Sequence, residues 1–128
     1  SPAPSIDYIA GIDLACNAVM PPIYLGEFEY AVLLATLHLD QEAYAVPIRE
    51  LIESRTARPV ARGALYTALD RLEGKRCLRS RMGDSTDERG GKARRYFTVT
   101  AAGLKALKAT HGALASMAKG LETILERS

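Results

Sequence analysis

The residues of this chain best suited to chemistry are its bases, and they are crowded into its middle. Thirteen of the 17 Lys and Arg residues lie within residues 49–95, whereas residues 1–48 carry six acidic residues and no Lys or Arg. Guanidinium and ammonium groups bind phosphate oxygens, so such clustering is typical of proteins that bind nucleic acid. A basic face that is merely solvated is the alternative that charge alone leaves open.

The nucleophilic and metal-ligating residues form no catalytic or metal-binding motif in the sequence. His38 and His111 stand singly, and Cys16 and Cys77 are too far apart for any metal-ligand spacing. No Ser, Cys or carboxylate occurs in a recognised nucleophile or metal motif. We therefore predict a protein that is not an enzyme and that holds neither a metal ion nor a cofactor.

The composition predicts a globular cytoplasmic protein. Hydrophobic residues make up 48% of the 128 residues, which is enough for a packed core. No apolar run approaches the roughly 18–20 residues of a membrane span, so no membrane association is expected. Residues 1–19 contain no Lys or Arg, which a secretory signal peptide would carry. In a reducing cytoplasm the two cysteines are expected to be free thiols.

Three helices are predicted in the first part of the chain, and they must position the bases. Apolar residues recur at helical spacing over residues 26–39, 44–55 and 61–73. Gly74 is a stop signal for the third helix, because glycine readily takes the left-handed conformation in which many helices end. The buried stripe of the third helix should consist of Leu65, Leu69 and Leu72.

A basic β-hairpin and a long helix are predicted to follow. Residues 78–82 alternate in polarity, residues 83–92 are polar and rich in glycine, and residues 94–99 are typical of a returning strand. Thr100 is a good N-cap for a final helix that continues to about Glu126. The result is a mainly α chain with a small β-hairpin, in the order of a winged helix-turn-helix. In that fold the third helix enters a DNA groove and the hairpin is the wing.

Side chains that could contact DNA are predicted on the third helix and on the hairpin. Arginine can hold guanine with two hydrogen bonds, and hydroxyl groups can hold phosphate. Cations around Gly90 and Gly91 suit phosphates and the minor groove. Asp70 would repel phosphates, so we expect it to pair with a basic side chain such as Arg71 or to read a cytosine amine. The predicted DNA-binding residues are Arg62, Gly63, Tyr66, Thr67, Arg71, Lys75, Arg89, Lys92, Arg94 and Arg95.

The final helix carries a predicted dimerisation seam. Its apolar positions step by three and four residues over about three heptads, which is typical of a coiled coil. Packing onto the chain's own first helix is the alternative, and the two do not exclude each other. The seam consists of Leu104, Leu107, His111, Leu114, Ala118, Leu121 and Leu125.

Residues 1–24 stand apart from the rest of the chain. Apolar residues from Ile9 to Val19 recur at helical steps, so a short helix is one interpretation. The other is a natural start at Met20, which makes residues 1–19 an added extension. We therefore divide the chain into an N-terminal extension (1–24), a winged-helix DNA-binding domain (25–100) and a C-terminal dimerisation helix (101–128).

Several stretches resemble the PadR-like family of transcriptional regulators. Residues 63–73 (GALYTALDRLE) resemble that family's recognition helix, and residues 88–97 (ERGGKARRYF) resemble its wing. Residues 100–104 (TAAGL) resemble the entry to its last helix. Shorter likenesses occur at 25–29 (LGEFE) and 43–48 (AYAVPI).

This resemblance covers roughly residues 25–107. It implies a homodimer that binds a palindromic DNA operator sequence-specifically, usually as a repressor, and that a small-molecule effector can release. The chain departs from the family at Ala61, where Ser is frequent, and at Ala45 and Ala57, where Gly is common. Arg76-Cys77 replaces a frequent pair of Gly and a hydrophobic residue. The alternative function is a winged-helix module that binds protein without binding DNA.

Overall fold

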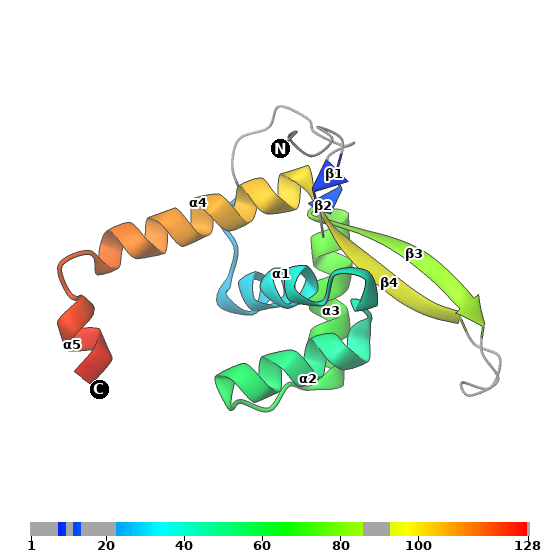
Figure 1. The fold of residues 1–128 in the computed structure, drawn as a ribbon, viewed down its shortest axis with the longest axis horizontal. Helices are drawn as coiled ribbons and strands as arrows, with labels where there is room; N and C mark the ends of the chain where they lie inside the picture. Colours follow the sequence, from blue (N-terminus) through cyan, green and yellow to red (C-terminus); the bar gives the residue numbers. More distant parts are fainter. Residues whose placement is uncertain (1–7, 10–11, 14–22, 86–92, 128) are drawn as a thin grey trace, which may run out of the picture.

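The computed structural model describes residues 8–9, 12–13, 23–85 and 93–127. Its elements follow the predicted order of three helices, a hairpin and a C-terminal helical region (Figure 1). The mainly α winged-helix prediction is therefore confirmed. The elements are β1 (Tyr8–Ile9), β2 (Ile12–Asp13), α1 (Glu27–Leu39), the 3₁₀-helix η1 (Asp40–Glu42), α2 (Ala45–Thr56), α3 (Arg62–Gly74), β3 (Leu78–Ser85), β4 (Ala93–Thr100), α4 (Ala101–Ala118) and α5 (Glu122–Arg127).

The hydrophobic core lies where α1, α2 and α3 meet the base of the hairpin. Val32 and Leu33 of α1 and Ile48 of α2 are fully buried there, together with Val99 of β4. Burying one such side chain stabilises the fold by about 1.5–3 kcal/mol. The predicted stripe of α3 is buried in full, which turns the opposite face of that helix outward; the stripe is Leu65, Leu69 and Leu72.

A tight corner ends α3 and sets the direction of the hairpin. The amide of Cys77 donates to the carbonyl of Leu72 at 2.8 Å, and the amide of Arg76 donates to the carbonyl of Glu73 at 3.0 Å. These hydrogen bonds form a Schellman motif whose left-handed residue is Arg76, with φ of 64°. Gly74, predicted as the stop signal, is instead the last residue of the helix. The left-handed position thus falls on an arginine, where the conformation costs more than it does in glycine.

β3 and β4 form the predicted antiparallel hairpin, which projects from the helical body (Figure 1). Leu78 pairs with Val99, and Met82 pairs with Arg95. Because side chains alternate between the two faces of a strand, Arg79 and Arg81 both lie on the opposite face from Leu78, and both are exposed. The hairpin therefore has one face toward the core and α3 and one outer, basic face.

The short helix considered for residues 1–24 is wrong for the residues described in that segment. Tyr8–Ile9 and Ile12–Asp13 are strands that pair with each other, and the sheet order is β1-β2-β4-β3. β2 also pairs parallel to β4, with Ile12 opposite Val99. The second edge of β4 offers backbone hydrogen bonds to an extended segment, and a helix could not take them.

α4 leaves the body of the molecule, and α5 folds back from its end (Figure 1). As predicted, Thr100 caps α4: its hydroxyl oxygen accepts from the amide of Gly103 at 3.0 Å. The prediction of one helix continuing to Glu126 is wrong, because the chain breaks helix at Lys119 and Gly120. Gly120 has φ of 91°, a conformation that glycine takes at little cost and that ends helices. No helix within the described ranges is long and apolar enough to cross a membrane.

Candidate nucleic-acid interface

The outward face of α3 carries the first group of predicted DNA-binding residues. Arg62, Gly63 and Thr67 are exposed, and 47% of Tyr66 is exposed. Ala61 precedes the helix and has no side-chain oxygen with which to cap the first-turn amides. A Cβ atom added at Gly63 would meet no described atom within 4 Å, so the chain's own packing does not require glycine there. Glycine weakens a helix, but because it has no side chain it lets an external partner approach the backbone closely.

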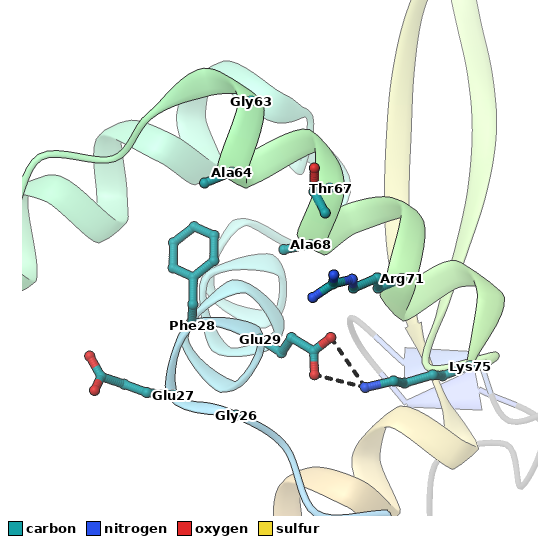
Figure 2. Close-up of a pocket in the computed structure, with 10 residues that line it drawn as sticks. All are labelled: Gly26, Glu27, Phe28, Glu29, Gly63, Ala64, Thr67, Ala68, Arg71 and Lys75. Atoms are coloured by element: carbon teal, nitrogen blue, oxygen red, sulfur yellow. Dashed lines mark hydrogen bonds and ion pairs between the residues drawn. The ribbon is translucent and has the colours of Figure 1, made fainter.

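One flank of α3 borders an open groove against the start of α1 (Figure 2). The groove has a volume of about 870 Å³. Phe28 points into it from α1, and Arg71 points into it from α3. Lys75 donates to both carboxylate oxygens of Glu29, at 2.9 and 3.2 Å, so an acid of α1 neutralises this predicted DNA-binding cation.

Hydrogen bonds and ion pairs join the inner face of the hairpin to α3. Glu73, in the last turn of α3, accepts a hydrogen bond from the hydroxyl of Ser80 on β3 at 2.6 Å. The guanidinium of Arg95 on β4 forms an ion pair with the other oxygen of Glu73. The same guanidinium donates to Asp70 at 3.4 Å. Asp70 therefore pairs with a basic side chain, one of the two roles expected for it, and its partner is Arg95 and not Arg71.

The outer face of the hairpin carries two tyrosine rings in contact, each with an arginine over it. The rings of Tyr44, at the start of α2, and Tyr96, on β4, meet edge to face with centroids 5.5 Å apart. The guanidinium of Arg94 lies 4.4 Å from the centroid of Tyr44, and that of Arg81 lies 4.7 Å from the centroid of Tyr96. A Cβ atom at Gly83 would lie only 2.5 Å from the ring of Tyr96, so glycine is needed for that ring to lie across β3.

The structure thus separates the predicted DNA-binding residues into three groups. Those of α3 are exposed, and they are Arg62, Gly63, Tyr66, Thr67 and Arg71. Lys75, Arg94 and Arg95 make contacts with other residues of the chain. Arg89 and Lys92 lie outside the described residues.

Sequence reasoning missed the partners of these cations, Glu29, Glu73 and Tyr44. The only local signal was the spacing of Asp70 and Glu73, which places both acids on one flank of the third helix. Which basic side chain reaches that flank depends on how the hairpin folds back. Spacing within α3 could not reveal it.

The buried thiol of Cys77 lies at the corner between α3 and β3. Burial raises the pKa of this thiol, Glu29 adds to the rise, and the nearby Lys75 opposes it. A thiol held in the protonated form is a poor nucleophile and a poor metal ligand. Among the residues that the structure describes, no group of three His, Cys, Asp or Glu side chains could hold a metal ion.

The predicted dimerisation seam divides into a buried part and an exposed part. Leu107 is buried against the chain's own core, and Leu104 and Ala118 are partly buried. His111 is exposed, and so are Leu114, Leu121 and Leu125. Packing onto the chain's own first helix was the alternative considered from the sequence. α1 does contact α4, but among the seam residues only Leu107 is buried.

An outward third helix beside a basic hairpin defines a winged helix-turn-helix of the DNA-binding class. The sequence model of the Transcriptional regulator PadR-like family matches residues 33–109, more than half of the chain. The chain belongs to this family, the PadR-like transcriptional regulators. It is therefore a DNA-binding regulator and not an enzyme.

Solved structures of the family share the fold. A PadR family transcription regulator from hypervirulent Clostridium difficile R20291 is 22% identical, with a TM-score of 0.62 over 78% of this chain and 99% of that one. A PadR-like transcription factor from Bacteroides fragilis is 27% identical, with a TM-score of 0.54 over 79% and 89% of the two chains. A PadR family regulator from Eggerthella lenta DSM 2243 is 23% identical, with a TM-score of 0.57 over 77% and 82%. No sequence among the curated proteins matches this chain.

Proposed function

We propose that the chain represses transcription as a homodimer that binds a palindromic operator through α3. The observation that carries the proposal is the exposure of Arg62, Tyr66 and Thr67 along a helix whose other face is locked in the core. The major groove admits a helix and presents a different pattern of donors and acceptors for each base pair. A rigid helix with one long cation at its N-terminus is suited to reading that pattern. Release from the operator by a small-molecule effector forms part of the proposal through family membership.

The hairpin supplies contacts that do not depend on sequence. Arg89 and Lys92 flank two glycines in the segment between β3 and β4 and are assigned to phosphates or to the minor groove. Arg94, stacked on Tyr44 at the start of α2, is assigned to a phosphate beside the groove that α3 enters. Arg71, on the flank of α3 that borders the groove of Figure 2, is assigned to a neighbouring phosphate, whereas Lys75 is held by Glu29.

A second copy of the chain is the partner that the C-terminal helices require. Met117 is 79% exposed, Ile124 is 64% exposed, and Leu114 and Leu125 are each 59% exposed. A run of exposed large apolar side chains marks an interaction surface. A symmetric dimer pairs such a surface with itself, and it also supplies the two recognition helices that a palindrome demands.

Selection of bound sites from random duplexes at two salt concentrations tests the DNA-binding proposal. We expect a two-fold symmetric consensus with half-sites about one helical turn apart, or a multiple of it. Arg62→Ala should relax the preference at one base position per half-site and cost about 1–3 kcal/mol of binding free energy. Arg55→Ala, at the far end of α2, is the matched control and should leave the consensus unchanged. Recovery of no consensus, or an affinity that does not respond to salt, would favour a protein-binding module.

Adding charge to the exposed apolar surface tests the dimer. Leu114→Glu should give a monomer by sedimentation and weaken operator binding severely, because each copy would bring a carboxylate into an apolar contact. Ser116→Glu adds the same charge on another face of α4 and should leave the dimer intact. A Leu114→Glu chain that remains a tight dimer contradicts this interface.

A further inference from the structure

One carboxylate of α3 holds both strands of the hairpin. The two oxygens of Glu73 are divided between Ser80 on β3 and Arg95 on β4. In the hairpin, Ser80 pairs with Phe97, and Arg95 pairs with Met82 one step further along the same face. The guanidinium of Arg95 also lies over the ring of Phe97, 5.1 Å from its centroid. A single side chain therefore joins the helix to the hairpin at two residue pairs that are neighbours on the same face of the hairpin.

Partial burial gives this contact more weight than a surface ion pair. The side chain of Glu73 is 32% exposed and that of Arg95 is 40% exposed, so solvent screens the pair only in part. Arg95 has Glu73 and Asp70 on one side and the ring of Phe97 on another. Its positive charge is already matched by two acids of α3, which makes it a poor candidate for a further anionic partner.

We propose that Glu73 is a positioning residue of the DNA interface, which docks the hairpin on α3 through Ser80 and Arg95, and that Arg95 is a strut and not a phosphate contact. The inference rests on the proposed DNA-binding function. It replaces the sequence-based assignment of Arg95 to phosphate. Docking fixes the distance between the groove-reading face of α3 and the wing, so the two bind one duplex as a rigid unit.

A docking role for Glu73 and simple electrostatics predict opposite changes in DNA affinity when Glu73 is neutralised. An acid near DNA repels phosphates, so its removal should strengthen binding if Glu73 does nothing else. If Glu73 positions the hairpin, Glu73→Gln should instead weaken binding to the selected duplex about tenfold, the loss expected for one charge-assisted hydrogen bond. Glu50→Gln on α2 is the matched control. It removes the same charge from an exposed side chain and should bind as tightly as the wild type or slightly more tightly.

Salt dependence tests the role of Arg95. Each phosphate contact that is lost makes the slope of log affinity against log salt shallower by about 0.9. Arg95→Gln should lose affinity and keep the wild-type slope. The double variant Glu73→Gln with Arg95→Gln should lose no more than the weaker-binding single variant, since both changes break one contact. A shallower slope for Arg95→Gln, additive losses, or unchanged or tighter binding by Glu73→Gln would each overturn the proposal.

Two further measurements protect the test from a folding defect and from failure of the DNA-binding proposal. Ser80→Ala removes one donor to Glu73 without changing any charge, and it should lower affinity slightly at an unchanged salt slope. Amide hydrogen exchange of Phe97 and Thr98 should be faster in Glu73→Gln than in Glu50→Gln. Equal exchange overturns the docking role even if DNA binding stands. If the wild type binds no duplex but exchange is still faster in Glu73→Gln, the docking contact stands and only its link to DNA binding is refuted.

Discussion

The two halves of α4 have similar compositions and opposite surroundings. In the first half, Gly103, Ala106, Leu107 and Thr110 are buried. From residue 111 onward, every residue of α4 except Ala118 is exposed, although Leu114 and Met117 are as apolar as the buried residues. The first half therefore belongs to the core of the winged helix, and the second half presents an uncovered apolar surface.

The two halves of α4 differ in exposure because different segments of the chain contact them. The amide of Leu25 donates to the hydroxyl of Thr110 at 3.0 Å, so the chain that leads into α1 crosses α4 there. At its start, α4 sits on the α3–β3 corner: the amide of Thr100 donates to the carbonyl of Cys77 at 3.1 Å. Beyond Thr110 the residues of the helix are exposed, apart from Ala118. A sequence period that looks uniform thus serves folding at one end and, in our proposal, association at the other.

The largest expected effect separates Leu107 from Leu114. Leu107→Ala should lower the free energy of unfolding by about 2–5 kcal/mol, because it leaves a cavity in the core. Leu114→Ala should cost the isolated chain less than about 0.5 kcal/mol and should weaken the dimer instead. Denaturant titrations at several protein concentrations distinguish the two. Equal losses at concentrations where both chains are monomeric would contradict the comparison.

A pair of glycines in α4 gives a second contrast. A Cβ atom at Gly103 would lie 2.2 Å from the carbonyl oxygen of Cys77, whereas one at Gly112 would meet no described atom within 4 Å. Gly103→Ala should therefore destabilise the chain by about 1–3 kcal/mol through a forced shift of α4. Gly112→Ala should stabilise it by about 0.5–1 kcal/mol, since alanine favours the helix. Thermal unfolding of both variants checks the signs, and loss of stability in both would show that the second half is also packed.

Two residues with a left-handed backbone lie near the two ends of α4, and they give a smaller contrast. Arg76, whose carbonyl accepts from the hydroxyl of Thr100, has φ of 64°, and Gly120 has φ of 91°. Arg76→Gly should raise the free energy of unfolding by about 0.5–1 kcal/mol, because glycine removes the cost of the left-handed conformation. Gly120→Ala introduces that cost, and it should loosen α5 while leaving the core intact. Hydrogen exchange that reports slower opening of the α3–β3 corner in Arg76→Gly would support this result, and faster opening would refute it.

The smallest expected effect is a pH dependence carried by Cys77, under the first half of α4. Burial raises the pKa of this thiol in the folded chain. Its contribution to stability is therefore complete below the unfolded value, about 8.5, and is lost as the pH rises through the folded value. Wild-type stability should fall more steeply above that pH than the stability of Cys77→Ala. Parallel stability curves for the two chains would mean that the thiol is not shielded in the folded state.

The order of elements, the α3 stripe and the basic wing could be predicted because each depends on local spacing. Burial of Leu65, Leu69 and Leu72 follows from a period of 3.6 residues, and so does the outward position of Arg62 and Thr67. Alternation at residues 78–82 likewise placed Arg79 and Arg81 on the outer face. Family membership was also visible in contiguous motifs.

Only the tertiary structure decided which basic side chains are paired with acids of the same chain. It also decided where the seam of α4 passes from buried to exposed. Arg95 meets Glu73 across 22 positions of sequence, and Lys75 meets Glu29 across 46. Such pairings depend on how the hairpin and α1 are placed around α3, and no local period encodes that placement. The left-handed backbone of Gly120 ends the helix that carries the seam. The hydrogen bond from the amide of Leu25 to the hydroxyl of Thr110 marks where the buried part of α4 ends. Spacing determines which face of a helix is apolar, but contacts between distant segments determine what covers that face.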